Sequence, residues 1–230
     1  MKVVNYLGFN IYVPIRYYHS NLIERFEKNI YEKEEIGFIT KYFNNNDYVL
    51  ELGSCLGIVS GLLSKICNNV ISIEANPELK ESLELTKNHN KLDNLIFING
   101  YLDKEKKEIE YQTYDNIVAG SGDREDKEIN NVRGWGNTQK IYNIQTIILN
   151  EIKNIENINS LVIDIEGGEL KFLYNFDNFI KSNIKKICIE LHGHLMKENE
   201  DSFNSKCINK IIKNGFKLIE RNGISYYFEK

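Results

Sequence analysis

Short apolar runs alternate, over much of the chain, with longer segments whose apolar residues recur at helical spacing. The runs at 48–53, 69–74 and 94–100 have the length and composition of buried strands. Residues 58–66 and 77–89 between them are predicted helices, and the second begins with a proline, which is favoured in a first helical turn. Strands and helices that alternate in this way predict βαβ units and a parallel sheet.

The alternation resumes in the second half of the chain, after a polar stretch. Strands are predicted at 160–166 and 185–192, and the runs 216–220 and 224–229 flank Arg221-Asn222-Gly223, which is a hairpin signal. Further helices are predicted at 20–41, at 146–154, from Glu169 onward and at 201–213. The predicted fold is α/β and Rossmann-like, with a mostly parallel doubly wound sheet and an antiparallel C-terminal hairpin.

The length and composition predict one domain that carries an insertion. The chain has 230 residues, of which 42% are hydrophobic, enough for a single core. We expect residues 1–46 to form an N-terminal extension packed on the core and residues 47–230 to form the main domain. The polar, glycine-rich stretch 101–142 interrupts the alternation and is predicted to be an insertion over the substrate site.

Charge and cysteine content argue against several classes of protein. The net charge of −4 disfavours binding to duplex nucleic acid, which needs a concentrated basic face. No apolar run approaches the roughly 18 residues of a membrane span, and the N-terminus does not have the pattern of a signal peptide. The four cysteines lie far apart, which predicts reduced thiols and a cytoplasmic location. The sequence does not indicate the oligomeric state.

A glycine-containing turn follows the first strand of the main domain, where open α/β sheets bind ligands. Glu51 precedes this turn, Gly53 permits a tight turn close to a ligand, and Gly57 lets the next helix pack near the strand. Glu74 ends the second strand 21 positions after Gly53, near the spacing at which a carboxylate reaches ribose hydroxyls. The combination predicts a nucleotide-containing cofactor.

Charge distinguishes between the candidate cofactors. Dinucleotides place a pyrophosphate on this turn with the motif GxGxxG, and this chain lacks the first glycine of that motif. Glu51 beside the turn would repel a pyrophosphate and attract the cationic sulfonium and α-amino groups of S-adenosylmethionine. We therefore expect S-adenosylmethionine. An NAD-dependent oxidoreductase is one alternative, and a binding module that kept the fold but lost turnover is another.

Two later strands carry ionisable residues toward the same edge of the sheet. Asp164 lies near the end of one strand, and Glu190 and His192 of the next strand share a face because they are two residues apart. The three could converge as carboxylate and imidazole ligands of a divalent metal ion. The alternative is that His192 and His194 are surface residues and Glu190 is an ion-pair partner. Glu169, which begins the next predicted helix, could have a catalytic role or could simply place a favourable negative charge in the first turn of that helix.

Two catalytic schemes follow for these residues if the acceptor is a hydroxyl. In the first scheme Asp164, Glu190 and His192 hold a divalent ion that would lower the pKa of the hydroxyl and orient it toward the methyl group. In the second scheme no metal is used and His192 is the general base. Chelation distinguishes the two schemes.

Three segments carry a resemblance to a known family. The first, YEKEEIGFITKYFNNNDYVLELGSCLGIVSGLLSK, leads into the cofactor turn, and the second, VISIEANPELKESLELTKNHNKL, has an acidic strand end followed by Asn-Pro. The third is NIQTIILNEI followed by LVIDIEGGELKFL, with an Asp-x-Glu-Gly-x-Glu run. In these segments, about residues 31–100 and 143–192, the chain resembles the FkbM-type methyltransferases.

The resemblance implies a class I methyltransferase fold and O-methylation, often of sugars. By matching position it implies a cofactor loop formed by Glu51, Gly53, Ser54, Cys55 and Gly57. It also implies that Glu74 binds the ribose and that Ala75 and Asn76 lie beside the adenine. The family's signature would be Asp164, Glu166, Gly167 and Glu169. The chain departs from the family in two ways. The usual Gly-Ala-Asn is Gly53-Ser54-Cys55 here, and residues 101–142 match little.

The acceptor is expected to be a small molecule or glycan, with a nucleotide-linked sugar of glycan, capsule or other polysaccharide biosynthesis as one candidate. Arg124, Arg133 and Trp135 in the insertion suit a diphosphate and a sugar or base face, and the alternative for them is a solvated loop. A non-sugar acceptor is the other possibility. N-methylation is disfavoured because the proline-containing tetrapeptides typical of it are absent.

Overall fold

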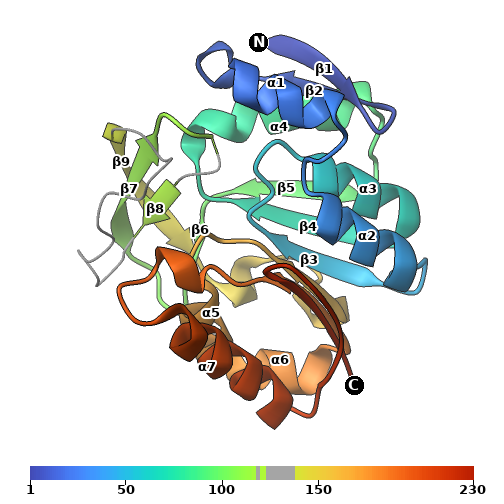
Figure 1. Ribbon diagram of the computed structural model, residues 1–230, viewed down its shortest axis with the longest axis vertical. Coiled ribbons are helices and arrows are strands. Elements are labelled where there is room, and N and C mark those ends of the chain that lie inside the picture. Colours follow the sequence, from blue (N-terminus) through green and yellow to red (C-terminus); the bar gives the residue numbers. More distant parts are fainter. Residues whose placement is uncertain (118–119, 123–137) are drawn as a thin grey trace.

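The computed structural model describes residues 1–117, 120–122 and 138–230, and its main element is a sheet with the strand order β12-β13-β11-β10-β3-β4-β5 (Figure 1). The parallel strands are β3 (Tyr48–Leu52), β4 (Asn69–Glu74), β5 (Leu95–Asn99), β10 (Ser160–Ile163) and β11 (Lys186–Glu190). Strand β13 (Ser225–Glu229) runs antiparallel to both β11 and β12 (Lys217–Asn222). The predicted sheet and its hairpin are confirmed.

Helices cover both faces of this sheet (Figure 1). Successive strand residues point to opposite faces, so Val49 joins the core under one set of helices and Leu50 joins the core under the other. The first set is α2 (Lys33–Tyr42), α3 (Ile58–Ile66) and α4 (Lys80–His89), and the second is α5 (Glu169–Asn175), α6 (Asp177–Asn183) and α7 (Glu200–Lys213). Among the described residues, no helix is long and apolar enough to cross a membrane.

Two predicted helices are wrong in their extent or type. The helix expected at 20–41 is broken into α1 (Ser20–Glu27) and α2, because Asn29 and Glu32 between them have left-handed backbone conformations, with φ of 53° and 50°. The helix expected at 146–154 is instead the end of strand β9 (Thr138–Ile147) followed by the 3-10 turns Leu149–Glu151 and Ile155–Asn157. Hydrogen bonds from Thr146 to the segment around Lys107 hold this stretch extended.

The insertion forms a second, smaller sheet beside the carboxyl ends of the parallel strands (Figure 1). Its strands are β6 (Tyr101–Leu102), β7 (Glu108–Tyr114), β8 (Gly120–Gly122) and β9, in the order β6-β9-β7-β8. Gly100 links β5 directly to β6, which places the small sheet against the same edge of the main sheet.

The N-terminal residues form a hairpin that packs on helix α4 (Figure 1). Its strands are β1 (Lys2–Tyr6) and β2 (Phe9–Val13), and a 3-10 turn at Ile15–Tyr17 follows. Backbone N–H groups of Asn10 and Tyr12 donate to the side chains of Asn90 and Thr86, at 2.9 and 3.1 Å. Two further 3-10 turns lie at Pro77–Leu79, before α4, and at Gly193–Leu195, after β11.

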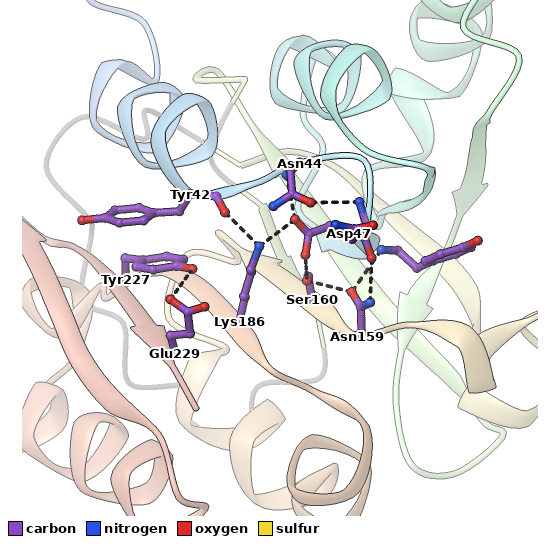
Figure 2. Close-up of polar contacts among 10 residues, drawn as sticks. Tyr42, Asn44, Asp47, Asn159, Ser160, Lys186, Tyr227 and Glu229 are labelled. Atoms are coloured by element: carbon purple, nitrogen blue, oxygen red, sulfur yellow. Dashed lines mark hydrogen bonds and ion pairs between the residues drawn. The ribbon is translucent and has the colours of Figure 1, made fainter.

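A buried ion pair joins the amino ends of the central strands, at the edge opposite the insertion (Figure 2). The ammonium of Lys186 lies 2.9 Å from the Asp47 carboxylate, which also accepts hydrogen bonds from the Asn44 backbone at 2.7 Å and the Ser160 hydroxyl at 2.8 Å. Asp47 is 3% exposed. Because Asp47 immediately precedes β3 and Ser160 and Lys186 begin β10 and β11, the pair connects the starts of three neighbouring strands.

Replacing Lys186 with methionine is therefore expected to destabilise the protein by about 3 kcal/mol, near the low end for breaking a buried pair, because Asp47 would keep a buried charge without its cation. Urea unfolding measures the change. Lys41→Met is the matched control, since Lys41 pairs with Glu220 at the surface. Equal unfolding midpoints for the two variants would show that the buried pair contributes no more than an exposed one.

Candidate active site

A cavity of about 740 Å³ opens at the carboxyl ends of the parallel strands. Gly53, Cys55, Glu74 and Ala75 line it from the ends of β3 and β4, and Asp164 and Glu166 line it from the loop after β10. Tyr101, Lys107, Tyr111 and Gly122 close it from the side of the inserted sheet. The site lies where the sheet changes its winding direction, the place at which open α/β sheets bind ligands.

The turn after β3 requires glycine for a reason that lies in the protein itself. Gly53 has φ of +88°, and a Cβ there would overlap the backbone carbonyl oxygen of Asp164. Gly57 has φ of +77° and begins α3 against Leu83. The sequence predicts a ligand close to Gly53; the structure adds that the Asp164 backbone, just after β10, already occupies the space of a side chain.

Cys55 occupies the position at which the family has asparagine. Its φ is 46°, a left-handed value that asparagine tolerates better than most residues. The thiol accepts a hydrogen bond from the Tyr31 hydroxyl at 3.5 Å, and the backbone N–H donates to Glu74 at 2.8 Å. The left-handed turn is thus held by the backbone N–H and the thiol of Cys55.

Glu74 connects the two loops at the cofactor end. One carboxylate oxygen accepts the N–H of Cys55 at 2.8 Å, and the other accepts the N–H of Asn76 at 2.7 Å. Burial raises the pKa of Glu74 to about 7, against the opposing effect of these backbone donors. Since each carboxylate oxygen has two lone pairs, Glu74 can still accept ribose hydroxyls from the cavity.

The Glu51 carboxylate does not lie beside the cofactor cavity, where the sequence predicted it. Its carboxylate accepts hydrogen bonds from the hydroxyls of Ser60 and Ser72 and is 1% exposed. Burial raises its pKa to about 7. Its position beside the two serines does not support a direct contact between Glu51 and the sulfonium.

The other predicted cofactor residues also lie outside the lining of the large cavity, as the described residues define it. Ser54 is buried in the turn, and Gly57 caps α3. The Asn76 side chain accepts the N–H of Glu78 at 3.0 Å and caps the turn before α4. These residues shape the loops on which Gly53, Cys55, Glu74 and Ala75 meet the cavity.

At the chemical end, His192 lies near both Asp164 and Glu190, and the set with His192 whose ligand atoms all lie within 4.8 Å of one another is Asp164, Glu166 and His192. The Nε2 atom of His192 lies 3.6 Å from Asp164, 3.5 Å from Glu190 and 3.7 Å from Glu166. The Nδ1 atom is hydrogen-bonded to Glu169 at 2.9 Å, and that bond orients the ring. Glu169 therefore has a specific partner in addition to its position in the first turn of α5.

His192 is buried, whereas His194 is exposed. The alternative that both histidines are surface residues is therefore correct only for His194. Asp164 lines the large cavity, while His192 and Glu190 lie behind it.

Burial alone would lower the pKa of His192, but Glu169, Glu190 and Asp164 raise it well above its usual range. Burial and the nearby Glu190 raise the pKa of Asp164.

Two acidic residues of this region were missed in the sequence. Glu32 and Glu35 lie close to Asp164 and Glu190, and one carboxylate oxygen of each of the four lies within 4.8 Å of the others. The sequence does contain a pattern that could have identified Glu35. It shares a helical face with Phe38 and Ile39, so the apolar face of α2 contains a carboxyl group. The predicted acceptor residues Arg124, Arg133 and Trp135 lie outside the described residues.

Comparison with known proteins agrees with this geometry. The mostly parallel sheet with helices on both faces is a Rossmann-like fold. The sequence matches the methyltransferase FkbM domain over residues 54–218, which is well over half of the chain. The chain belongs to the FkbM methyltransferase family. No curated protein matches it.

Solved structures show the same fold at low sequence identity. Methyltransferase FkbM from Methylobacillus flagellatus KT has a TM-score of 0.55 and 11% identity, over 82% of this chain and 44% of that one. Trm5b from Pyrococcus abyssi has a TM-score of 0.51 and 13% identity, over 99% and 53%. The fibrillarin pre-rRNA processing protein of Methanococcus jannaschii has a TM-score of 0.50 and 13% identity, over 81% and 67%. The chain thus spans about half to two thirds of the length of these structures.

Proposed function

We propose that the protein transfers the methyl group of S-adenosylmethionine to a hydroxyl of a carbohydrate. One observation carries the proposal: a single cavity extends from Glu74, past Asp164, to the inserted sheet. A cofactor bound at Glu74 and an acceptor bound under the inserted sheet would therefore meet beside Asp164. Membership of a methyltransferase family supports the reaction type.

The charge of the cavity supports S-adenosylmethionine over NAD. Glu32, Glu74 and Asp164 line it near the cofactor loops. Carboxylates attract the sulfonium and α-amino groups and repel a pyrophosphate. In this proposal Gly53, Cys55, Glu74 and Ala75 contact the cofactor, and Glu51, Ser54, Gly57 and Asn76 hold the loops in shape.

The opposite end of the cavity supports an anionic acceptor. Lys104, Lys107 and Lys171 line it beside the inserted sheet, and Lys107 and Lys171 lie 3.4 and 3.5 Å from Asp103. Ammonium groups at this end suit the phosphates of a nucleotide-linked sugar, such as those used in glycan or capsule biosynthesis. The tyrosines of the inserted sheet offer faces for a sugar ring or a base.

We further propose that Asp164, Glu190 and His192 hold a divalent ion. When bound, the ion would supply Lewis acidity at the acceptor oxygen and orient that oxygen. The Glu169 carboxylate fixes the His192 ring so that Nε2 points to the other two residues, the arrangement by which outer carboxylates orient metal-binding imidazoles. Asp164 is the member of the set that also lines the large cavity.

The direct test is mass spectrometry of the purified protein incubated with S-adenosylmethionine and a panel of nucleotide sugars. A product heavier by one methylene unit, formed only with protein and cofactor, supports the proposal. Methylation of non-sugar acceptors alone would reject the carbohydrate. Binding of NAD without binding of S-adenosylmethionine would favour an oxidoreductase instead.

Glu74→Ala is expected to weaken S-adenosylmethionine binding by about 1.5–3 kcal/mol, the size of a charge-assisted hydrogen-bond pair. The substitution removes the ribose acceptor and also leaves two backbone N–H groups of the loops without their carboxylate. Calorimetry on the folded variant measures the loss. Glu81→Ala, at an exposed position of α4, is the control. Unchanged affinity in Glu74→Ala would place the ribose elsewhere.

A further inference from the structure

A second, much smaller cavity lies behind the cofactor loop. Its volume is about 20 Å³, and its walls include Glu32 and Glu35 from the N-terminal segment, Ser54 from the loop and Asp164 from the end of β10. A space of this size accommodates one water molecule or one ion of similar radius. Glu32 and Asp164 line the large cavity as well, so the two cavities share a wall.

Three residues that line the small cavity each have a buried oxygen atom with no hydrogen bond to any residue in the described part of the chain: Glu35 Oε1, Ser54 Oγ and Asp164 Oδ1. Glu35 is 2% exposed and Ser54 is 4% exposed. Buried polar atoms are nearly always satisfied, because an unpaired one costs free energy. Three such atoms around one small cavity indicate a ligand that they share.

The charge around the cavity indicates what that ligand is. Glu32, Glu35 and Asp164 line the cavity, and Glu190 lies just outside its lining; each of the four offers one carboxylate oxygen, and these oxygens lie within 4.8 Å of one another. Within the described residues, His192 is the only basic side chain that makes an ion pair with any of the four. A water molecule would satisfy the oxygens, and a divalent cation would in addition offset the repulsion between ionised carboxylates. Oxygen-only sets rich in carboxylates are the preferred ligands of hard divalent cations.

We propose that this small cavity binds a hard divalent cation, of the type of Ca²⁺, Mg²⁺ or Mn²⁺, through Glu32, Glu35, Asp164 and Glu190. The site uses two residues that precede or begin α2 and two at the ends of β10 and β11. The ion therefore connects the N-terminal segment to the floor of the cofactor site. Glu32 has a left-handed φ of 50°, which is a strained conformation for this residue, and a cation bound to its carboxylate would help to stabilise that conformation.

This site differs from the His192 set in its ligands, although it shares Asp164 and Glu190 with it. Its ligands are carboxylates alone, and Glu32 and Glu35 belong to it uniquely. The proposal does not depend on the acceptor or on methyl transfer, because binding is measured without either substrate. Failure of the proposed function would therefore leave this result unaffected.

The test is thermal unfolding and calorimetry of chelator-treated protein titrated separately with Ca²⁺, Mg²⁺ and Mn²⁺. A cation present at about a hundredfold excess over its Kd is expected to raise the Tm by about 5–10 °C. Glu35→Gln should abolish the shift, since glutamine keeps the shape and removes a ligand charge. Glu34→Gln is the matched control, because the neighbouring Glu34 is exposed, and it should keep the full shift. His192→Ala should also keep it.

Two results would overturn the proposal. The first is an equal response of Glu35→Gln and Glu34→Gln to each cation. The second is a wild-type shift no larger than that produced by KCl at equal ionic strength. Loss of the shift in His192→Ala as well as in Glu35→Gln would overturn the separation of the two sites.

Discussion

Asp164→Asn is expected to reduce methyl-transfer turnover by about 10²–10⁴-fold, with a much smaller effect on cofactor affinity, because Asp164 would help to hold the ion that promotes loss of the acceptor proton. Asparagine keeps the size of the side chain and removes the charge beside which cofactor and acceptor would meet. Single-turnover kinetics with a methylated-product assay measure the effect. Asp93→Asn, at an exposed position, is the control. Wild-type turnover in Asp164→Asn would remove this residue from the chemistry.

Chelation then distinguishes the metal-assisted scheme from the base-only scheme. If a metal assists, chelation abolishes turnover, a particular divalent ion restores it, and Glu190→Ala is not rescued at ordinary metal concentrations. If His192 acts alone, chelators have no effect and only His192→Ala is severely impaired. The clustering of carboxylates around Nε2 of His192 supports the first result, because carboxylates and an imidazole are common ligands of divalent ions. Full activity after exhaustive chelation, with no metal in elemental analysis, would reject the metal.

The chelation result can also be separated from the carboxylate site behind the loop. His192→Ala removes a ligand of the catalytic set and keeps Glu32 and Glu35. If the catalytic ion is the one that matters for turnover, this variant loses activity while it retains the cation-dependent rise in Tm. Loss of activity without loss of the thermal shift therefore assigns the effect to the His192 set.

Gly53→Val is expected to eliminate measurable S-adenosylmethionine binding. A Cβ at this position would overlap the Asp164 carbonyl oxygen, and a branched residue is strongly disfavoured at φ of +88°. The turn must move away from β10, and it takes Cys55 and its hydrogen bond to Glu74 with it. Calorimetry, with circular dichroism to confirm folding, measures the loss.

Gly215→Ala separates backbone strain from overlap in this experiment. Gly215 has a similar φ of +91°, but no atom lies within 4 Å of the position of its Cβ. Its substitution should therefore cost only the strain of a left-handed residue, about 1–2 kcal/mol of stability, and leave the cofactor affinity unchanged. If Gly53→Val retained the wild-type affinity, the cofactor would not depend on this turn.

Much of the fold was readable from the sequence because its signals are local. The apolar runs at 48–53 and 160–166 are long enough to be buried strands, and the alternation with helices leaves few arrangements of a parallel sheet. The hairpin at Arg221-Asn222-Gly223 has a turn signal in consecutive residues. The convergence of Asp164 and His192 also followed, because carboxyl ends of neighbouring parallel strands share one edge.

The tertiary structure decided the features that depend on contacts between distant segments. The helix expected from Thr146 onward is instead a strand end, and hydrogen bonds between Thr146 and the segment around Lys107 hold it there. The helix at 20–41 breaks at two left-handed residues, and that break places Glu32 beside Asp164, more than 130 positions away. The sequence predicts that Glu51 contacts the cofactor. In the structure its carboxylate accepts hydrogen bonds from Ser60 on α3 and Ser72 on β4, outside the lining of the large cavity. Charge and spacing in the sequence therefore determined which residues could act, and packing determined which atoms face the cavities.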